Sequence, residues 1–257
     1  MTDIPEASRH SRREALTRLG AAALTLGTPM SMAQHPARST PDSNKPDKKE
    51  DEDFERLLRL ASVPSMSVAA IDGERISTRV LGVRRGGEAE RVTPDTVYAA
   101  ASLTKAVFSY VLLGLVRDGL ILLDRPVREY LPLPNPDDPR AAAITARRLL
   151  SHSGGWRNWR NSATQSLTAD FDPGTRWSYS GEGFFFLQRV VEKLTGKGMS
   201  LLARERVFEP LGMKRSSMAG LAELEPYQAA GHNSRGERNP LFPCCPTFCR
   251  RTRRRAC

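Results

Sequence analysis

Hydrophobic and polar positions in the first third of the sequence predict a short helix followed by a β-hairpin. Residues Phe54–Val63 (FERLLRLASV) have the spacing of a short amphipathic helix. Residues Ser65–Val83 form two strand-like runs that meet at Asp72-Gly73, a dipeptide typical of tight hairpin turns. Apolar residues fall on both faces of this hairpin (Val68, Ala70, Ile71, Ile76, Val80 and Leu81). A lone hairpin is unstable in water, so we expect it to belong to a larger, covered sheet.

A long apolar helix is predicted after the hairpin. Thr93 and Pro94 have the pattern of a helix start, with the threonine as N-cap and the proline in the first turn. A longer helix then runs from about Ser102 to Asp118 and is stopped by Gly119. Its apolar residues surround most of the circumference, which predicts burial on nearly all sides (Val107, Phe108, Val111, Leu112, Leu115 and Val116).

The later segments have mainly helical patterns. Thr145 is the expected cap of a helix in TARRLLSHSGG, EGFFFLQRVVEKLTG is amphipathic and ends at Gly196, and SLLARERVFEPLGM is a third helical segment. Strand-like patterns are scarce after Val83. The sequence therefore predicts an α/β fold of the α+β type, in which two strands precede a mostly helical region.

Composition divides the chain into four parts. Residues 1–33 carry Arg12-Arg13, a mildly apolar run and small residues before Gln34, which resembles a twin-arginine export signal; the alternative is an ordinary amphipathic helix. Residues 34–53 are rich in proline, serine and charge and are predicted to be a disordered linker. Residues 54–238 are the predicted folded domain that carries the candidate catalytic residues. Residues 239–257 are an atypical tail rich in cysteine and arginine. We expect a periplasmic or secreted protein.

Charge and cysteine content narrow the classes of partner. The net charge is +10, but five arginines lie in the last fourteen residues, so the basic excess is not spread over the domain and does not favour nucleic-acid binding. No apolar run is long enough for a membrane span in the mature chain. The four cysteines (Cys244, Cys245, Cys249 and Cys257) lack zinc-ligand spacing, and disulfides among them stay open. From about Asn239 the composition is typical of an out-of-frame or unrelated end.

Candidate chemistry lies at the start of the long apolar helix. Ser102 and Lys105 are three residues apart, so one helical turn brings their side chains to the same face. The helix N-terminus and a desolvated lysine would both favour ionisation of the serine hydroxyl. This is the arrangement of an activated nucleophile, although serine and lysine at this spacing also occur by chance.

Four ordered blocks of sequence resemble the serine β-lactamase and penicillin-binding-protein family, in its class C-like esterase and D,D-peptidase branch. The blocks are TPDTVYAAASLTKAVFSYVLLGLVRDGLILLDRPVREYLP, ITARRLLSHSGG, FDPGTRWSYSGEGFFFLQRVVEKLTG and VFEPLGMKRSSM, and the resemblance covers about residues 58–235. It implies a β-lactamase/D,D-peptidase-like fold, with an antiparallel sheet flanked by helices plus a helical region. It also implies an acyl-enzyme mechanism on esters, β-lactams or D-alanyl peptides, without metal or cofactor.

The resemblance assigns roles to individual residues. Ser102 would be the acylated nucleophile, Lys105 would accept or relay its proton, and Tyr179 would be the phenolic acid and base. Gly181 stands in the substrate-binding position where many relatives have asparagine, which favours ester over β-lactam hydrolysis. Trp156 is expected to border the substrate pocket, together with Trp159. Glu182 receives no role.

The third motif of the family, Lys-Thr-Gly or His-x-Gly on a strand, is missing after Tyr179. His232 lacks a strand pattern, and His152 is expected to be a structural hydrogen-bonding residue beside the site. The sequence therefore predicts that the C-terminal strands are absent and that the chain is weakly active or inactive. The alternatives are an inactive remnant or binding module, and a protein that binds acidic surfaces through Arg250–Arg255.

Overall fold

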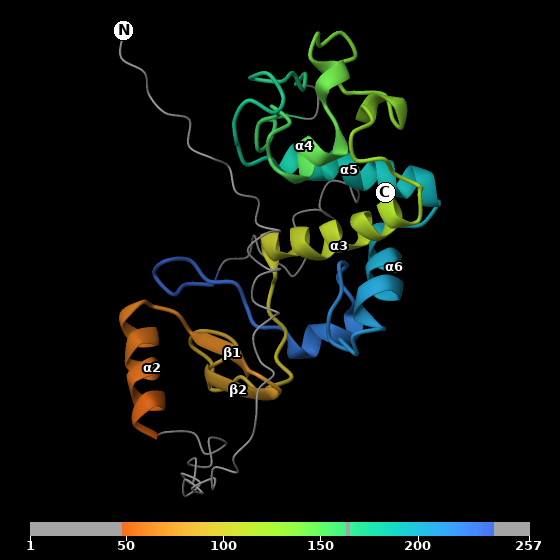
Figure 1. The fold of residues 1–257 in the computed structure, drawn as a ribbon. Helices are drawn as coiled ribbons and strands as arrows, with labels where there is room; N and C mark the ends of the chain where they lie inside the picture. Colours follow the sequence, from red (N-terminus) through yellow and green to blue (C-terminus); the bar gives the residue numbers. More distant parts are fainter. Residues whose placement is uncertain (1–47, 163–164, 239–257) are drawn as a thin grey trace, which may run out of the picture. The chain divides into compact units, whose positions relative to one another are not determined.

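The computed structural model describes residues 48–162 and 165–238. The helices are α2 (Lys48–Leu60), α3 (Thr104–Arg117), α4 (Ala146–Leu150), α5 (Gly181–Thr195) and α6 (Met199–Ala203), and the strands are β1 (Ser65–Asp72) and β2 (Arg75–Gly82) (Figure 1). The predicted export signal at 1–33 and the tail at 239–257 lie outside the described residues. No helix of the described part combines the length and apolar character that crossing a membrane requires.

Helix α2 corrects the predicted boundary of the linker. The helix begins at Lys48, so the acidic stretch 48–53 is its first part and not the end of a disordered segment. Glu50 and Asp51 lie in the first turn, where carboxylates complement the positive end of the helix dipole. Both also pair with Arg79 of β2, at 2.8 Å and 3.1 Å. Composition alone indicated solvation, but these carboxylates have a partner that lies far away in sequence.

Strands β1 and β2 form the predicted hairpin. They pair antiparallel, with Ile71 opposite Ile76 and Asp72 opposite Arg75 at the turn. Gly73 adopts a φ of +59°, which the tight turn requires and which glycine adopts without steric cost. Within the described residues the sheet contains these two strands alone. The larger sheet that the two-sided apolar pattern predicted is therefore not present in this part of the chain.

The segment at Thr93 is a turn and not the predicted helix start. The Thr93 hydroxyl accepts a hydrogen bond from the backbone N–H of Asp95, and the Thr96 hydroxyl accepts one from the backbone N–H of Thr93. Side chains that bond to the nearby backbone in this way stabilise turns in competition with helices. Helical structure begins only at the 3-10 turn Ala101–Leu103, which leads into α3.

Helix α3 agrees with the predicted span, but it is buried along one face only. The buried face contains Phe108, Val111, Leu112 and Leu115, whereas Tyr110 and Leu113 are exposed. The prediction of burial on nearly all sides is therefore wrong, because apolar residues on the outer face have no cover in the described structure. Gly119, with a φ of +77°, follows the helix as expected.

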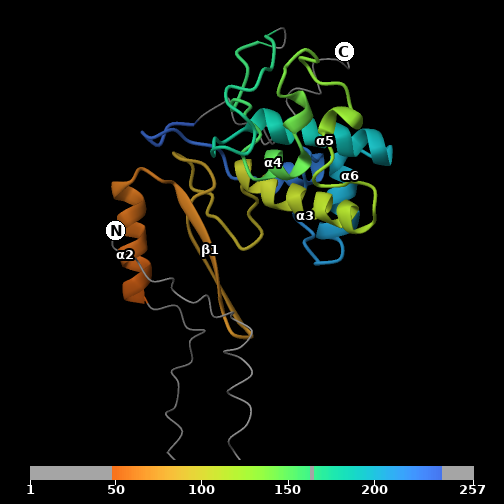
Figure 2. The same ribbon diagram turned by 45° about the horizontal axis from the view of Figure 1, so that its top comes forward.

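Helices α3, α4, α5 and α6 lie together and enclose the hydrophobic core (Figures 1 and 2). The predicted caps are confirmed: the Thr145 side chain accepts from the Arg148 N–H at the start of α4, and Gly196 ends α5 in the left-handed conformation. The Ser180 hydroxyl caps α5 by accepting from the Gly183 N–H. A π-helical turn, Arg204–Phe208, continues α6.

Candidate active site

Ser102 lies in the tight turn that leads into α3. The preceding residue, Ala101, has a φ of +44°, a conformation that is costly for a residue with a Cβ. The Lys105 Nζ lies 3.2 Å from the Ser102 Oγ, within hydrogen-bonding distance. The spacing of the two residues therefore produces the contact that helical geometry predicted, and backbone strain is concentrated directly beside the serine.

Tyr179 reaches the same serine from a different part of the chain. Its Oη lies 2.8 Å from the Ser102 Oγ, although the two residues are 77 positions apart. The Lys105 Nζ lies 4.9 Å from the centre of the Tyr179 ring and 5.5 Å from that of Phe184, so the ammonium group is packed against two aromatic faces. Three of the predicted site residues are therefore in mutual contact.

The charge and the hydrogen bonds of this cluster lower the pKa of Tyr179. Partial burial by itself raises the pKa of Tyr179, but hydrogen bonds with Lys105 and Ser102 and the positive charge of Lys105 outweigh it. The pKa of Tyr179 consequently lies below its usual value of 10.0. A phenol with a lowered pKa beside a serine hydroxyl is a suitable proton acceptor, because the phenolate is easier to form.

His152 packs against the Tyr179 ring and bonds to the backbone on both sides of it. Its ring centre lies 4.5 Å from that of Tyr179, and its Nδ1 accepts the backbone N–H of Ser180 at 3.1 Å. Its carbonyl oxygen accepts the Ser178 N–H at 2.7 Å. Burial, with a smaller effect from the Lys105 charge, lowers the pKa of His152 below 6.5, so the ring is neutral at pH 7. These contacts fit the structural role that was predicted for this histidine.

Gly181 is the first residue of α5, and its missing side chain is replaced by a ring from elsewhere. A Cβ added at Gly181 would lie 2.5 Å from Cη2 and 2.6 Å from Cε2 of Trp159. Any side chain here would therefore displace the indole. Sequence reasoning noted the lost asparagine at this position, but it could not predict that Trp159 takes up the space.

The residues on either side of Trp159 are anchored to the start of α5. The Gly181 N–H donates to the Asn158 carbonyl at 3.1 Å and to its Oδ1 at 2.9 Å. Arg160 binds Glu182 twice, through its backbone N–H at 3.0 Å and through Nη2 at 3.2 Å. Glu182, which had no predicted role, is therefore the buried carboxylate that fixes the loop carrying Trp159.

Trp156 was predicted to border the substrate pocket, but the structure places it in the core. Its side chain is 1% exposed and packs edge-on against Phe186, at 5.3 Å between ring centres. A ring buried in the hydrophobic core has no surface to offer a substrate. Trp156 is thus a core residue, and Trp159, three positions later, is the tryptophan that contacts the candidate site.

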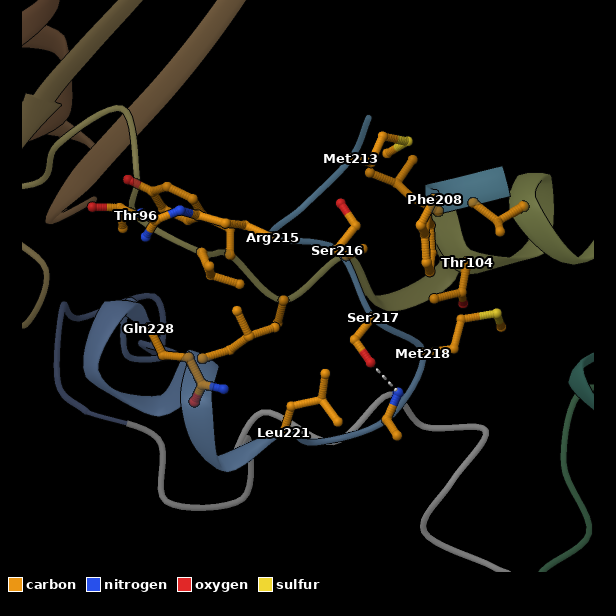
Figure 3. A pocket seen from close by; sticks show the side chains of 18 of the residues that line it. Thr96, Thr104, Phe208, Met213, Arg215, Ser216, Ser217, Met218, Leu221 and Gln228 are labelled. Carbon is orange, nitrogen blue, oxygen red and sulfur yellow. Dashed lines mark hydrogen bonds between the residues drawn. The ribbon is translucent and has the colours of Figure 1, made fainter. Parts of the chain in front are cut away.

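A cavity of about 500 Å³ lies next to the turn that carries the serine (Figure 3). Ala101 and Leu103, the two neighbours of Ser102, contribute to its wall, and α3 adds Thr104 and Val107. Apolar residues from 208–224 line it as well (Phe208, Met213, Met218, Leu221 and Leu224). Ser102, Lys105 and Tyr179 do not line this cavity, so it is separate from the candidate catalytic cluster.

The third family motif has no counterpart among the described residues. His232 forms a single bridge with Arg238, and its Nε2 accepts the Gly86 N–H at 2.9 Å, which is a structural contact. Nowhere in 48–162 and 165–238 do three or more histidine, cysteine, aspartate or glutamate side chains gather as a metal site would need.

The chain is similar to a known protein family and to several curated proteins. The profile of the Beta-lactamase family matches residues 51–243. Penicillin-binding protein 4 of Amycolatopsis lactamdurans is 30% identical over 181 residues, which cover 64% of this chain and 47% of that protein. Esterase EstB of Burkholderia gladioli is 27% identical over 218 residues, which cover 73% of this chain and 55% of the esterase. The chain spans between about a third and about half the length of the curated relatives it matches.

Solved structures show the same relationship at the level of the fold. A class C beta lactamase has a TM-score of 0.66 and 20% identity, with 75% of this chain and 58% of that chain covered. This likeness confirms the predicted β-lactamase/D,D-peptidase-like fold. Because the family profile also matches most of the chain, the protein belongs to the β-lactamase family.

Proposed function

We propose that this chain is a serine hydrolase that forms an acyl-enzyme on Ser102. The observation that carries the proposal is the 2.8 Å contact between the Tyr179 Oη and the Ser102 Oγ, beside the Lys105 ammonium at 3.2 Å. A nucleophile, a proton acceptor and a fixed positive charge are the groups that acyl transfer requires. The proposed substrates are esters, β-lactams or D-alanyl peptides, and no metal or cofactor takes part.

The proposed acylation step starts with Tyr179 as the phenolate, which the Lys105 charge stabilises. The Ser102 Oγ forms a bond to the substrate carbonyl carbon while its proton moves to the Tyr179 oxygen. The resulting tetrahedral oxyanion collapses, the bond to the leaving group breaks, and the leaving group takes the proton from Tyr179. The acyl group is then on Ser102, and Tyr179 is again ionised.

Deacylation uses the same groups in the reverse order. Water attacks the acyl carbon and gives its proton to Tyr179, and the bond to Ser102 breaks as Oγ recovers that proton. The product acid leaves, and the starting protonation state is restored. Lys105 holds Ser102 and the phenolate together, because its Nζ contacts both side chains.

Esters are the favoured substrate class within this proposal. Position 181 has no side-chain amide to hold an amide-containing substrate, and the Trp159 ring fills the space. The relatives include both a penicillin-binding protein and an esterase. An ester also needs less assistance to expel its leaving group than an amide does, so it tolerates a simpler site.

Labelling with a fluorophosphonate tests the assignment of the nucleophile. We expect mass spectrometry to find the label on the peptide that contains Ser102, and Ser102→Ala to abolish it. Hydrolysis of p-nitrophenyl acetate should fall by about 10³-fold or more in the same variant. Ser109→Ala, on the same helix, is the matched control and should label like the parent. Labelling that persists in Ser102→Ala would sink the proposal.

A second candidate function is a module that is acylated but turns over slowly. It is favoured by the two-stranded sheet of the described residues, which contains no strand with the third family motif. Loss of one oxyanion donor lowers rates by ~10²–10³. Stopped-flow release of p-nitrophenol separates the two functions: one equivalent followed by a slow phase indicates the module, and sustained turnover indicates the hydrolase.

We also propose that residues 1–33 direct export by the twin-arginine route. The supporting pattern is the Arg12-Arg13 pair before a weakly apolar run, in a part of the sequence outside the described residues. Replacing both arginines by lysine should leave the protein in the cytoplasm of a bacterial host, as measured by fractionation. Unchanged export of the double variant would remove this assignment.

A further inference from the structure

The segment 177–180 runs extended before α5, which begins at Gly181. The backbone N–H groups of Ser178 and Ser180 both donate to His152, one to its carbonyl oxygen at 2.7 Å and one to its Nδ1 at 3.1 Å. Alternate N–H groups that point the same way are a property of extended backbone, and Ser180 has extended angles (φ −131°, ψ 116°). Side chains at 177, 179 and 181 should therefore project to one side.

Aromatic groups occupy all three of these positions. Trp177 is 67% exposed, and its ring centre lies 6.5 Å from that of Tyr179 and 5.9 Å from that of His152. At the third position Gly181 contributes no side chain, and the Trp159 ring lies in the place of one. Trp177, Tyr179 and Trp159 thus form what we call the aromatic row, whose middle member contacts the Ser102 hydroxyl.

The Trp159 end of the row is held in place by its neighbours. Asn158 accepts the Gly181 N–H, and Arg160 pairs with the buried Glu182, so the backbone on both sides of Trp159 is tied to α5. An indole fixed in this way is a preorganised contact surface, because little side-chain freedom remains to be lost when a ligand binds. Trp177 has no such cover, since two thirds of its surface is open to solvent.

We propose that Trp159 and Trp177 are the specificity-determining residues of this site and that the aromatic row binds an apolar, flat group of the substrate. The inference rests on the proposed function and narrows its substrate class to esters with an aryl or similarly bulky apolar group. Two indoles offer a large apolar area and one N–H donor each, which suits such groups better than small or strongly hydrogen-bonding ones.

Two boronic acids measure this preference without relying on turnover. Phenylboronic acid and methylboronic acid both bind reversibly to a nucleophilic serine, and they differ in the presence of the aryl ring. Calorimetric titration of the parent chain gives the ratio of the two dissociation constants. We expect phenylboronic acid to bind the parent at least about 10-fold more tightly, which is the range that one well-packed apolar group contributes.

Single-residue variants test whether the aromatic row causes the preference for phenylboronic acid. Trp177→Ala and Trp159→Ala should each reduce the phenyl-to-methyl ratio by about 3–10-fold while methylboronic acid binds almost as before. Gly181→Ala should act like Trp159→Ala, because the added Cβ displaces that indole, and it is the second variant if Trp159→Ala does not fold. Tyr110→Ala, at an exposed aromatic of α3 outside the row, is the matched control and should leave the ratio unchanged.

The outcomes separate this inference from the function on which it rests. Boronates that bind Ser102→Ala as well as they bind the parent overturn the proposed nucleophile. A second outcome is that boronate binding requires Ser102 but the phenyl-to-methyl ratio is the same in the parent, in Trp177→Ala and in the variant at position 159 or 181. This outcome overturns the aromatic row alone. Failure of both boronates to bind the folded parent chain overturns both.

Discussion

The hairpin region, residues 48–100, and the helical region, residues 101–238, contain similar apolar patterns but bury them to very different degrees. The main hydrophobic cluster of the described residues lies between Phe108 and Met218, in the helical region, whereas the buried apolar residues of the hairpin region are Leu81 and Val92. In the hairpin, Ile71 and Ile76 are paired across the strands, yet they are 74% and 68% exposed. The pattern of a strand therefore predicts that it pairs, but not that anything covers it.

The candidate catalytic residues are also confined to one of these two regions. All three members of the candidate catalytic cluster belong to the helical region. Two of the three non-glycine residues with positive φ in the described part of the chain, Ala101 and His152, lie there too, whereas the third, Ser62, precedes β1 in the hairpin region. A packed core can hold strained backbone in place, because the surrounding contacts over-determine it. The exposed hairpin has few such contacts, and its uncovered edges and faces are a liability for association.

Two ion pairs give the largest expected contrast between the regions. In the helical region Glu182 is 1% exposed and pairs with Arg160, whereas in the hairpin region Glu50 is 54% exposed and pairs with Arg79. Glu182→Ala leaves the largely covered Arg160 guanidinium without this carboxylate and should cost about 3–5 kcal/mol of unfolding free energy. Glu50→Ala should cost about 0–1 kcal/mol.

Urea denaturation followed by circular dichroism measures both losses. Equal losses for Glu182→Ala and Glu50→Ala would contradict the contrast in burial. Glu182→Ala should also weaken the phenyl-to-methyl boronate preference, because it releases the loop that carries Trp159, and Glu50→Ala should not.

Two apolar truncations are the next test. Leu112→Ala removes a fully buried side chain from α3 and should cost about 2–5 kcal/mol, since it loses both transfer free energy and packing. Ile76→Ala removes a mostly exposed side chain and should change the free energy of unfolding by less than about 0.5 kcal/mol. Thermal melts at matched protein concentration compare the two. A large loss in Ile76→Ala would mean that this face of the hairpin is covered in solution.

Local signals were the ones that the sequence predicted well. The hairpin at Asp72-Gly73, the Thr145 cap and the Gly196 stop each depend on a few neighbouring residues, and all three are found. Thr93 shows the limit of such signals, because a threonine followed by a proline suits a turn as well as a helix start. The first turn of α2 pairs with Arg79, which lies too far away in the sequence for composition to reveal.

The candidate site likewise contains contacts that follow from local spacing and contacts that depend on tertiary packing. The Ser102–Lys105 contact follows from helical spacing, but the approach of Tyr179 depends on packing and was predicted through the family resemblance alone. The tryptophans are the clearest failure. Residues 156–161 repeat the triplet Trp-Arg-Asn, and nothing in the repeat distinguishes Trp156, which is in the core, from Trp159, which lies over Gly181.

A pH titration of stability gives the smallest expected effect, and it isolates one contact of the helical region. The pKa of His152 is lowered in the folded chain below its unfolded value of 6.5, mainly by burial. The unfolded chain therefore binds the proton more readily, and unfolding free energy decreases as pH falls from 6.5 toward the lowered pKa. Above 6.5 the contribution is fully present, because the ring is neutral in both states.

The mechanism of this loss is specific, because a protonated Nδ1 cannot accept the Ser180 N–H, and the new positive charge would face Lys105. His152→Asn is the informative variant: asparagine tolerates the positive φ of +56° and offers an acceptor oxygen, but it does not titrate. We expect the melting temperature of the parent to fall more steeply than that of His152→Asn between pH 7 and pH 5. Most carboxylates titrate below this window, so parallel curves would show that neutral His152 does not support the Tyr179 segment.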